Sequence, residues 1–108
     1  MLAGMRYKTV PLLGLVLLVM VTAACFKSPA ESAFERGRGY DEPPRDITKA
    51  IEEYDEAIKH DPTYAGAYFS RARAYLILGK CDEALRDFQK ASQFGHDRAY
   101  AGPICVAD

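Results

Sequence analysis

The feature that most constrains this chain is a pattern of small and aromatic residues that occurs twice, 34 residues apart (Ala50 to Ala84, for example). The positions are Ala50, Tyr54 and Ala57 in the first copy and Ala84, Phe88 and Ala91 in the second. Their spacing of three or four residues is that of one face of an α-helix. Small residues on such a face let two helices approach closely, and the aromatic ring fills the gap between them. The recurrence therefore predicts an all-α chain of repeated, antiparallel helix pairs.

The second copy predicts two complete helices. Its first helix runs to about Leu78 and ends at Gly79, since a glycine suits the left-handed conformation that follows many helices. We expect Pro62 to lie at or near the first turn of this helix, with Asp61 as its N-cap. The second helix begins at Cys81.

The first copy is less regular. Its second helix is clear, because Asp46 is a candidate N-cap and apolar residues recur behind it at helical spacing. Its first helix contains Gly37 and Gly39, each of which lowers helix propensity by about 1 kcal/mol relative to alanine. Two prolines then forbid helix continuation. We therefore expect a short, frayed helix at about residues 31–40, followed by a rigid turn.

The whole pattern resembles the tetratricopeptide repeat (TPR), a helix–turn–helix unit of about 34 residues that stacks into solenoids. The resemblance implies a TPR-like helical domain at residues 31–108. Its first repeat spans about 30–64, its second about 65–98, and a C-terminal cap 99–108. Two repeats are fewer than the three or so that such stacks usually need. We therefore expect a disulfide, self-association or a partner to compensate.

In this family the first helix of each repeat lines a concave groove that binds a peptide. The matching positions here are Phe69, Ser70, Arg73, Leu76 and Ile77. Leu76 and Ile77 beside Arg73 suit an apolar peptide or helix that carries an acidic group. The alternative is that Phe69, Leu76 and Ile77 make core or dimer contacts. The chain does not show the lysine and asparagine set that reads a C-terminal carboxylate in chaperone-binding members.

The N-terminus has the order of a secretory signal peptide, which is a positive segment, an apolar run and small residues. Arg6 and Lys8 precede an apolar run from Val10 to Val21, and Thr22–Ala24 lead to Cys25. The run is about a dozen residues, whereas a helix needs about 17–25 to span a bilayer. The segment therefore favours export over a stable membrane-spanning helix.

Small residues directly before a cysteine resemble the lipobox of bacterial lipoproteins, in which the cysteine is acylated and the signal is cut before it. The resemblance implies a signal peptide at residues 1–24 and a lipidated Cys25 with a tether at residues 25–30. Thr22 departs from the pattern, because the family usually has leucine there. Phe26, in place of aspartate, implies the outer membrane and a domain that faces the periplasm. The alternatives are an ordinary cleaved signal or an uncleaved signal-anchor.

With Cys25 lipidated, Cys81 and Cys105 remain in an oxidising compartment. If the chain turns back after Gly95, Cys105 returns towards the start of the helix that Cys81 opens, so we expect these two to form a disulfide. The alternative is that Cys81 merely fills the apolar position that Ile47 fills in the first copy, and that Cys105 is free.

No constellation of residues indicates catalysis, a cofactor or a metal ion. His60 and His96 lie at expected helix ends without the spacing of a metal site. Glu52 and Glu53 belong to a charged, solvated helix face. The net charge of −1 gives no reason to expect a nucleic-acid partner.

The sequence therefore predicts a lipid-anchored protein of the bacterial envelope that acts as a non-catalytic scaffold or adaptor. Its partner would be another envelope protein or a peptide segment. The alternative, from a different class, is a structural subunit that self-associates into a homo-oligomer and has no separate client.

Overall fold

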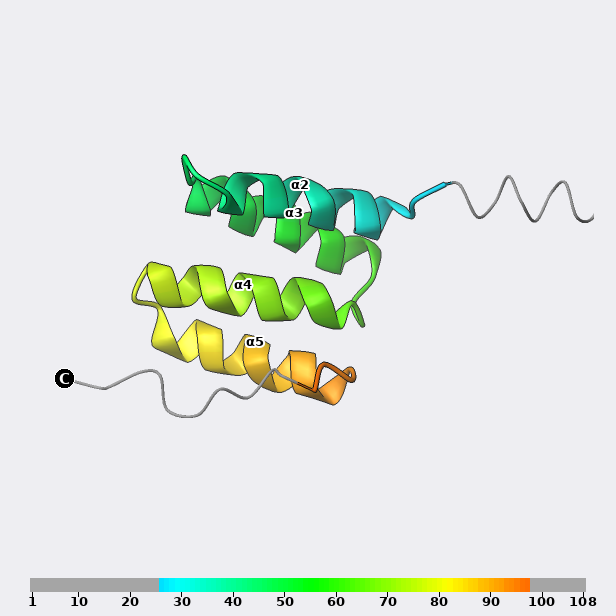
Figure 1. Cartoon of the computed structure of the whole chain (residues 1–108). Coiled ribbons are helices and arrows are strands. Elements are labelled where there is room, and N and C mark those ends of the chain that lie inside the picture. Colours follow the sequence, from blue (N-terminus) through cyan, green and yellow to red (C-terminus); the bar gives the residue numbers. More distant parts are fainter. Residues whose placement is uncertain (1–25, 98–108) are drawn as a thin grey trace, which may run out of the picture.

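The computed structural model describes residues 26–97, in which every regular element is a helix (Figure 1). The helices are α2 (Pro29–Asp41), α3 (Ile47–His60), α4 (Ala65–Ile77) and α5 (Cys81–Gln93). Among these described residues, no helix is long and apolar enough to cross a membrane. The predicted signal peptide, the lipidated Cys25, the C-terminal cap at residues 99–108 and Cys105 lie outside the described residues.

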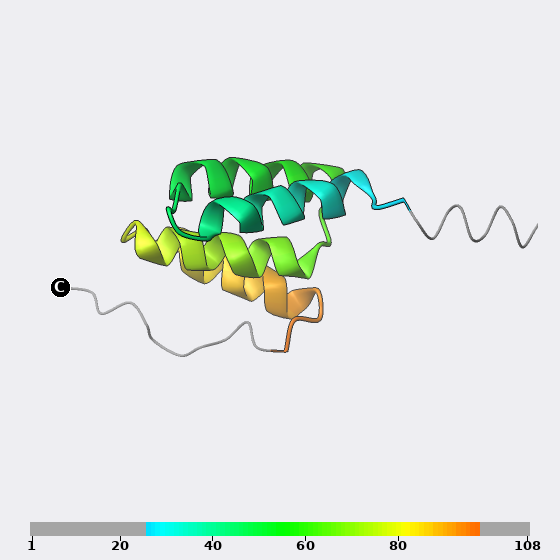
Figure 2. The same ribbon diagram turned by 45° about the horizontal axis from the view of Figure 1, so that its top comes forward.

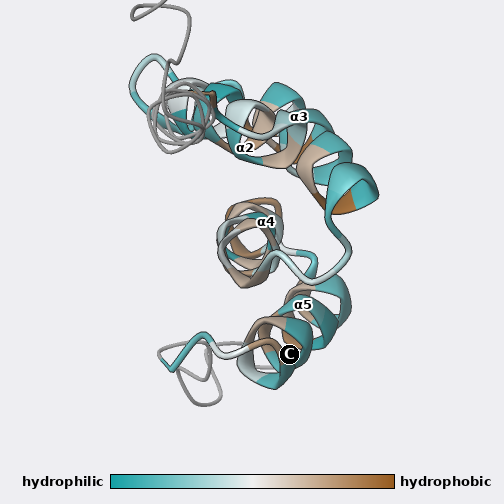
Figure 3. Ribbon diagram, turned by 90° about the vertical axis from the view of Figure 1, so that its right-hand side faces the viewer, coloured by the Kyte–Doolittle hydropathy of each residue, from teal (hydrophilic) through white to brown (hydrophobic). Residues whose placement is uncertain are grey.

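The four helices form two antiparallel pairs. Helix α2 packs mainly on α3 and α4 mainly on α5, while a smaller contact between α3 and α4 joins the pairs. Figure 2 shows α2 beside both α3 and α4, and α2 and α4 are in contact. Viewed along the helices, α2 and α4 lie on one side of the stack, with α3 and α5 on the other (Figure 3). The predicted all-α, repeated helix pairs are confirmed.

The recurring residues occupy the core of each pair, as predicted. All four alanines of the pattern are fully buried, and Tyr54 and Phe88 are 0% and 7% exposed. Because alanines let the helix backbones approach closely, the rings of Tyr54 and Phe88 can fill the remaining space between the helices. The residues that recur in the sequence therefore occupy equivalent buried positions in the two helix pairs.

The prediction of a short, frayed first helix is wrong. Helix α2 has 13 residues and begins at Pro29, with the Ser28 side chain accepting a hydrogen bond of 3.1 Å from the backbone N–H of Glu31. Ser28 and Pro29 thus provide an N-cap and a first helical residue with a suitable backbone angle. Gly37 is buried against the ring of Tyr54. Capping and this close packing outweigh the poor helix propensity of the glycines.

The prediction that Asp61 caps α4 is also wrong, whereas Asp46 does cap α3 by accepting a hydrogen bond of 3.1 Å from Lys49 N–H. Asp61 ends α3, and its carboxylate accepts bonds of 3.0 and 2.8 Å from the backbone N–H and hydroxyl of Thr63. Aspartate readily closes such a local turn. Pro62 therefore lies in the turn, and α4 starts only at Ala65.

Glycines end α4 and α5 in the same way. Gly79 and Gly95 have φ angles of +73° and +93°. Residues that carry a side chain rarely adopt such positive φ angles, whereas glycine does so readily. After each glycine, a backbone N–H turns back to the preceding helix: Lys80 donates to the carbonyl of Tyr75 at 2.8 Å and His96 to that of Ala91 at 2.9 Å. This is the Schellman ending of a helix, and it confirms the predicted end at Gly79.

Candidate functional site

A polar pocket opens between the C-terminal end of α2, the α2–α3 turn and α4. It has a volume of about 220 Å³ and is called here the α2–α4 pocket. The residues that line it are Arg38, Asp41, Glu42, Arg45, Tyr54, Ser70, Arg73 and Ile77. Because Tyr54 of α3 also lines it, both helix pairs contribute, and the pocket exists only when the two pairs are stacked.

Tyr54 supplies the buried base of the pocket. Its side chain is 0% exposed, and its hydroxyl donates a hydrogen bond of 3.3 Å to Asp41 Oδ2. Burial, followed by the negative charge of Asp41, raises the pKa of Tyr54 to about 12, although the charge of Arg73 acts in the opposite direction. The hydroxyl therefore stays protonated at physiological pH and fixes the position of the Asp41 carboxylate.

Two arginines at the pocket have no partner within residues 26–97. Arg45 and Arg73 are exposed and make no ion pair or side-chain hydrogen bond there, whereas Arg38 lies 3.5 Å from Glu35. A guanidinium can bind a carboxylate through two parallel hydrogen bonds. Ile77, 52% exposed, adds an apolar surface beside them. The pocket can thus receive an acidic group next to an apolar side chain.

The structure divides the five predicted groove residues between two environments. Ser70, Arg73 and Ile77 line the pocket. Phe69 and Leu76 are half-buried and pack on the core between α4 and α5. The Phe69 ring makes an edge contact with Phe88, with ring centres 5.7 Å apart, and stacks on His96 at 4.2 Å.

The sequence did not predict that α2 and the α2–α3 turn contribute residues to the pocket. Family resemblance points only to the first helix of the second repeat, while Asp41, Glu42 and Arg45 reach the pocket through the stacking of the two pairs. The one local signal was the charged, proline-containing turn itself.

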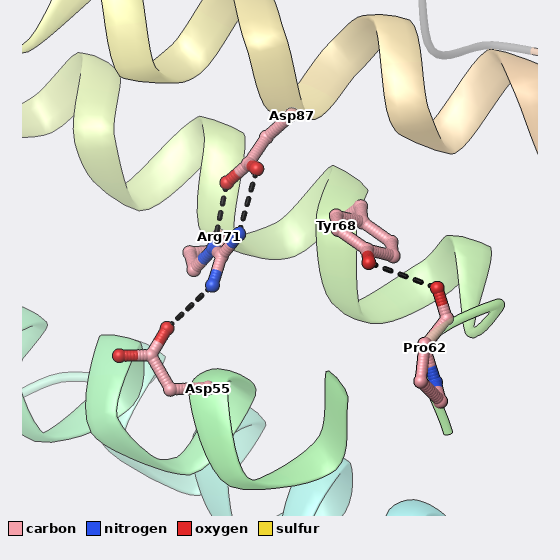
Figure 4. Close-up of polar contacts among 5 residues, drawn as sticks. All are labelled: Asp55, Pro62, Tyr68, Arg71 and Asp87. Carbon is pink, nitrogen blue, oxygen red and sulfur yellow. Dashed lines mark hydrogen bonds and ion pairs between the residues drawn. The ribbon is translucent and has the colours of Figure 1, made fainter. Parts of the chain in front are cut away.

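Arg71, two residues before Arg73, has a different role. It lies on another side of α4 and forms ion pairs with Asp87 at 2.7 Å and Asp55 at 2.6 Å (Figure 4). Burial lowers the pKa of Arg71, but its hydrogen bonds to the two carboxylates outweigh burial and raise the pKa above its ordinary value. Arg71 therefore joins α3, α4 and α5, and its guanidinium is already occupied.

Cys81 is disulfide-bonded. Its predicted partner, Cys105, lies outside the described residues, so the pairing stays a prediction. Within residues 26–97, no three histidine, cysteine, aspartate or glutamate side chains are grouped as a metal site would require.

Comparison with known proteins finds one family model that matches part of the chain. Residues 46–79 match the TPR repeat family. The matched segment contains α3, the following turn and α4, so it spans the junction between the two helix pairs. No solved structure matches the chain.

Three similar proteins match over comparable segments. The chain is 41% identical over 49 residues to DnaJ homolog subfamily C member 7 of Mus musculus, covering 45% of this chain and 10% of that protein. It is 38% identical over 61 residues to Hsp70-Hsp90 organizing protein 3 of Arabidopsis thaliana (56% and 11%). It is 44% identical over 45 residues to the tetratricopeptide repeat and J domain-containing co-chaperone DNJ1 of Fusarium oxysporum f. sp. lycopersici (42% and 9%). The chain thus spans about a tenth of the length of these relatives.

Proposed function

We propose that this chain is a non-catalytic adaptor that binds another protein at the α2–α4 pocket. The observation that carries the proposal is the presence of Arg45 and Arg73, without partners in the described residues, beside the exposed Ile77. Two guanidinium groups next to an apolar surface suit a peptide segment in which an acidic residue neighbours an apolar one.

The similar proteins support a role in protein association. The names of two of them, Hsp70-Hsp90 organizing protein and co-chaperone, describe proteins that work with other proteins. The matched segment includes α4, which carries Ser70, Arg73 and Ile77 of the pocket. We transfer only the general role of protein binding, and we assign this chain a partner in the bacterial envelope.

The proposed attachment is a lipid on Cys25, with the domain in the periplasm at the outer membrane. Helix α2 begins at Pro29, so the tether between the lipid and the domain would be very short. The pocket lies at the other end of α2, and a helix of 13 residues is about 20 Å long. The anchor would therefore hold the start of α2 at the bilayer and leave the pocket open to a periplasmic partner.

A photoreactive amino acid at position 77 tests the docking site in intact cells. Ile77 is exposed, so the replacement leaves the core unchanged. We expect an adduct with a second protein, mapped to a segment that contains an acidic and an apolar residue. The matched control is the same amino acid at Glu52, which is exposed on α3 outside the pocket. The same adducts from both positions would overturn the proposal, as would a segment without an acidic residue.

The anchor has an independent test. Globomycin, which blocks cleavage of lipoprotein signals, should cause an uncleaved precursor to accumulate, and Cys25→Ala should release the protein from the membrane fraction. Normal processing in the presence of globomycin, or unchanged attachment of the variant, would remove the lipoprotein part of the proposal and leave the docking site in place.

The second candidate function is a self-associating subunit, which the 40% exposure of Leu85 on α5 favours. Light scattering of residues 26–108 over a range of concentrations separates the two functions. A monomer at every concentration argues for the adaptor, whereas an oligomer that grows with concentration argues for self-association.

A further inference from the structure

The α2–α4 pocket carries charges of both signs that do not pair with one another. Its walls contribute three guanidinium groups and two carboxylates, from Arg38, Arg45, Arg73, Asp41 and Glu42. Within residues 26–97, no ion pair joins either carboxylate to any of these arginines. A ligand that enters the pocket therefore meets charged donors and charged acceptors alike.

The buried base of the pocket presents acceptors. Tyr54, which is 0% exposed, donates its hydroxyl proton to Asp41 Oδ2 over 3.3 Å. A phenol has one proton to donate and a carboxylate has none, so this pair turns only oxygen lone pairs towards a ligand. Asp41 is also half-buried, and a charge partner is worth more there than at a fully exposed position. The base therefore suits a cationic donor.

The rim of the pocket presents donors. Arg45 lies on the α2–α3 turn and Arg73 on α4, and both side chains are exposed. Figure 1 shows this turn and the C-terminal end of α4 at the same end of the stack. A guanidinium group carries donors and no acceptor, and it binds a carboxylate through two parallel hydrogen bonds. A ligand that satisfies both levels carries a cation at the base and an anion at the rim.

Charge and volume restrict the ligand further. Three guanidinium groups against two carboxylates leave one positive charge in excess, so a cation without an accompanying acid is repelled. The volume of about 220 Å³ is smaller than the roughly 300–1,000 Å³ of small-molecule sites. It suits one extended side chain, and the acid then comes from a neighbouring residue of the same segment. The ligand is thus part of a polypeptide.

We propose that the partner that docks at this pocket inserts a lysine to Asp41 and places a neighbouring acidic side chain against Arg45 and Arg73. An ammonium group on a flexible four-carbon stem passes between the arginines more easily than a planar guanidinium does. The Asp41 carboxylate, fixed by Tyr54, thereby determines specificity, because it favours a segment with a lysine beside an acid over a purely acidic one. This inference rests on the proposed docking at the pocket and adds the lysine to it.

The adduct that the full chain forms at position 77 in intact cells tests the lysine in two ways. The mapped partner segment should contain a lysine within about four residues of its acidic residue, which is the reach of neighbouring side chains on a helix or strand. Asp41→Asn should lower the adduct yield about tenfold, because the variant loses a charge-assisted hydrogen bond. Asparagine keeps an oxygen that accepts from Tyr54, so α2 should stay folded, and circular dichroism of the purified variant checks this.

The matched control is Asp82→Asn, which removes the same charge at another site. Asp82 is exposed in the first turn of α5 and lies outside the pocket. Its variant should give the adduct yield of the unaltered protein. A mapped segment without a lysine, an undiminished yield with Asp41→Asn, or an equal fall with Asp82→Asn would overturn the inference.

Replacement of the mapped lysine by methionine in the partner tests the contact without altering this chain. The yield should again fall about tenfold, and combining this change with Asp41→Asn should cause little further loss, because residues in direct contact do not act additively. Two falls that multiply would contradict the contact. An adduct that depends on Arg45 and Arg73 but not on Asp41 would remove the lysine and leave the docking site in place, so the two proposals fail separately.

Discussion

The guanidinium of Arg71 donates two hydrogen bonds, each 2.7 Å long, to the carboxylate of Asp87 (Figure 4). Asp87 is the buried charged residue of the described core, and the side chain of Arg71 is 18% exposed. This geometry satisfies both charges away from water, which is the condition under which a buried ion pair is tolerated.

Removal of Asp87 should therefore be costly. Asp87→Ala leaves the Arg71 charge partly buried with only the exposed Asp55 as its partner, and we expect a loss of about 3 kcal/mol in the free energy of unfolding, measured by urea denaturation. Asp55→Ala, at a side chain that is 52% exposed, should cost about 1 kcal/mol or less. Equal losses from the two variants would contradict the role assigned to the Arg71–Asp87 pair.

Two glycines of α2 should respond to alanine in opposite directions. A Cβ at Gly37 would lie 2.5 Å from Tyr54 Cε1, whereas a Cβ at Gly39 would meet nothing within 4 Å. Gly39→Ala should raise the free energy of unfolding by about 1 kcal/mol through helix propensity. Gly37→Ala should lower it by about 1–2 kcal/mol, because overpacking outweighs that gain. Thermal melting of the two variants checks the signs, and stabilisation by both would refute the close contact with Tyr54.

The raised pKa of Tyr54 predicts a loss of stability at high pH. In the unfolded chain the phenol ionises near its ordinary value of 10.0, but in the folded protein it does so only near 12. The protonated phenol thus contributes its full stabilisation below pH 10. This contribution, about 3 kcal/mol, is lost between pH 10 and 12. Burial also raises the pKa values of Tyr64 and Tyr75, so they add to the same slope.

Tyr54→Phe should reduce the slope of unfolding free energy against pH in this interval, measured by urea denaturation at several pH values. It should also delete the tyrosinate absorbance that appears last on alkaline titration of the folded protein. An unchanged slope would show that Tyr54 is not the main source of the effect.

The fold was largely predictable because its determinants are periodic. Alanines and rings at helical spacing identify helix faces, and their recurrence identifies the repeat, so the buried positions of Tyr54 and Phe88 followed from the sequence. The end of α4 at Gly79 followed from local chemistry. The start of α4 did not, because Asp61 had two local options and closed a turn with Thr63. Propensity alone does not decide between them.

The site was less predictable because it is assembled between helix pairs. A helical pattern gives the face of α4 that carries Arg73 and Ile77. It does not show which residues of the other helices face that side of α4. Arg45 and Tyr54 reach the pocket only through the stacking of the pairs. Propensity also misjudged Gly37, whose small size is required by the ring of Tyr54.

The most direct test of docking at the α2–α4 pocket is the yield of the position-77 adduct when the two arginines are neutralised. Both are exposed, so Arg45→Gln with Arg73→Gln should leave folding intact. Each charge-assisted hydrogen bond is worth about 1.5–3 kcal/mol, so we predict that the yield falls about tenfold or more. Arg86→Gln, an exposed arginine of α5 outside the pocket, should leave the yield unchanged. An undiminished yield in the double variant, or an equal fall with Arg86→Gln, would contradict the account.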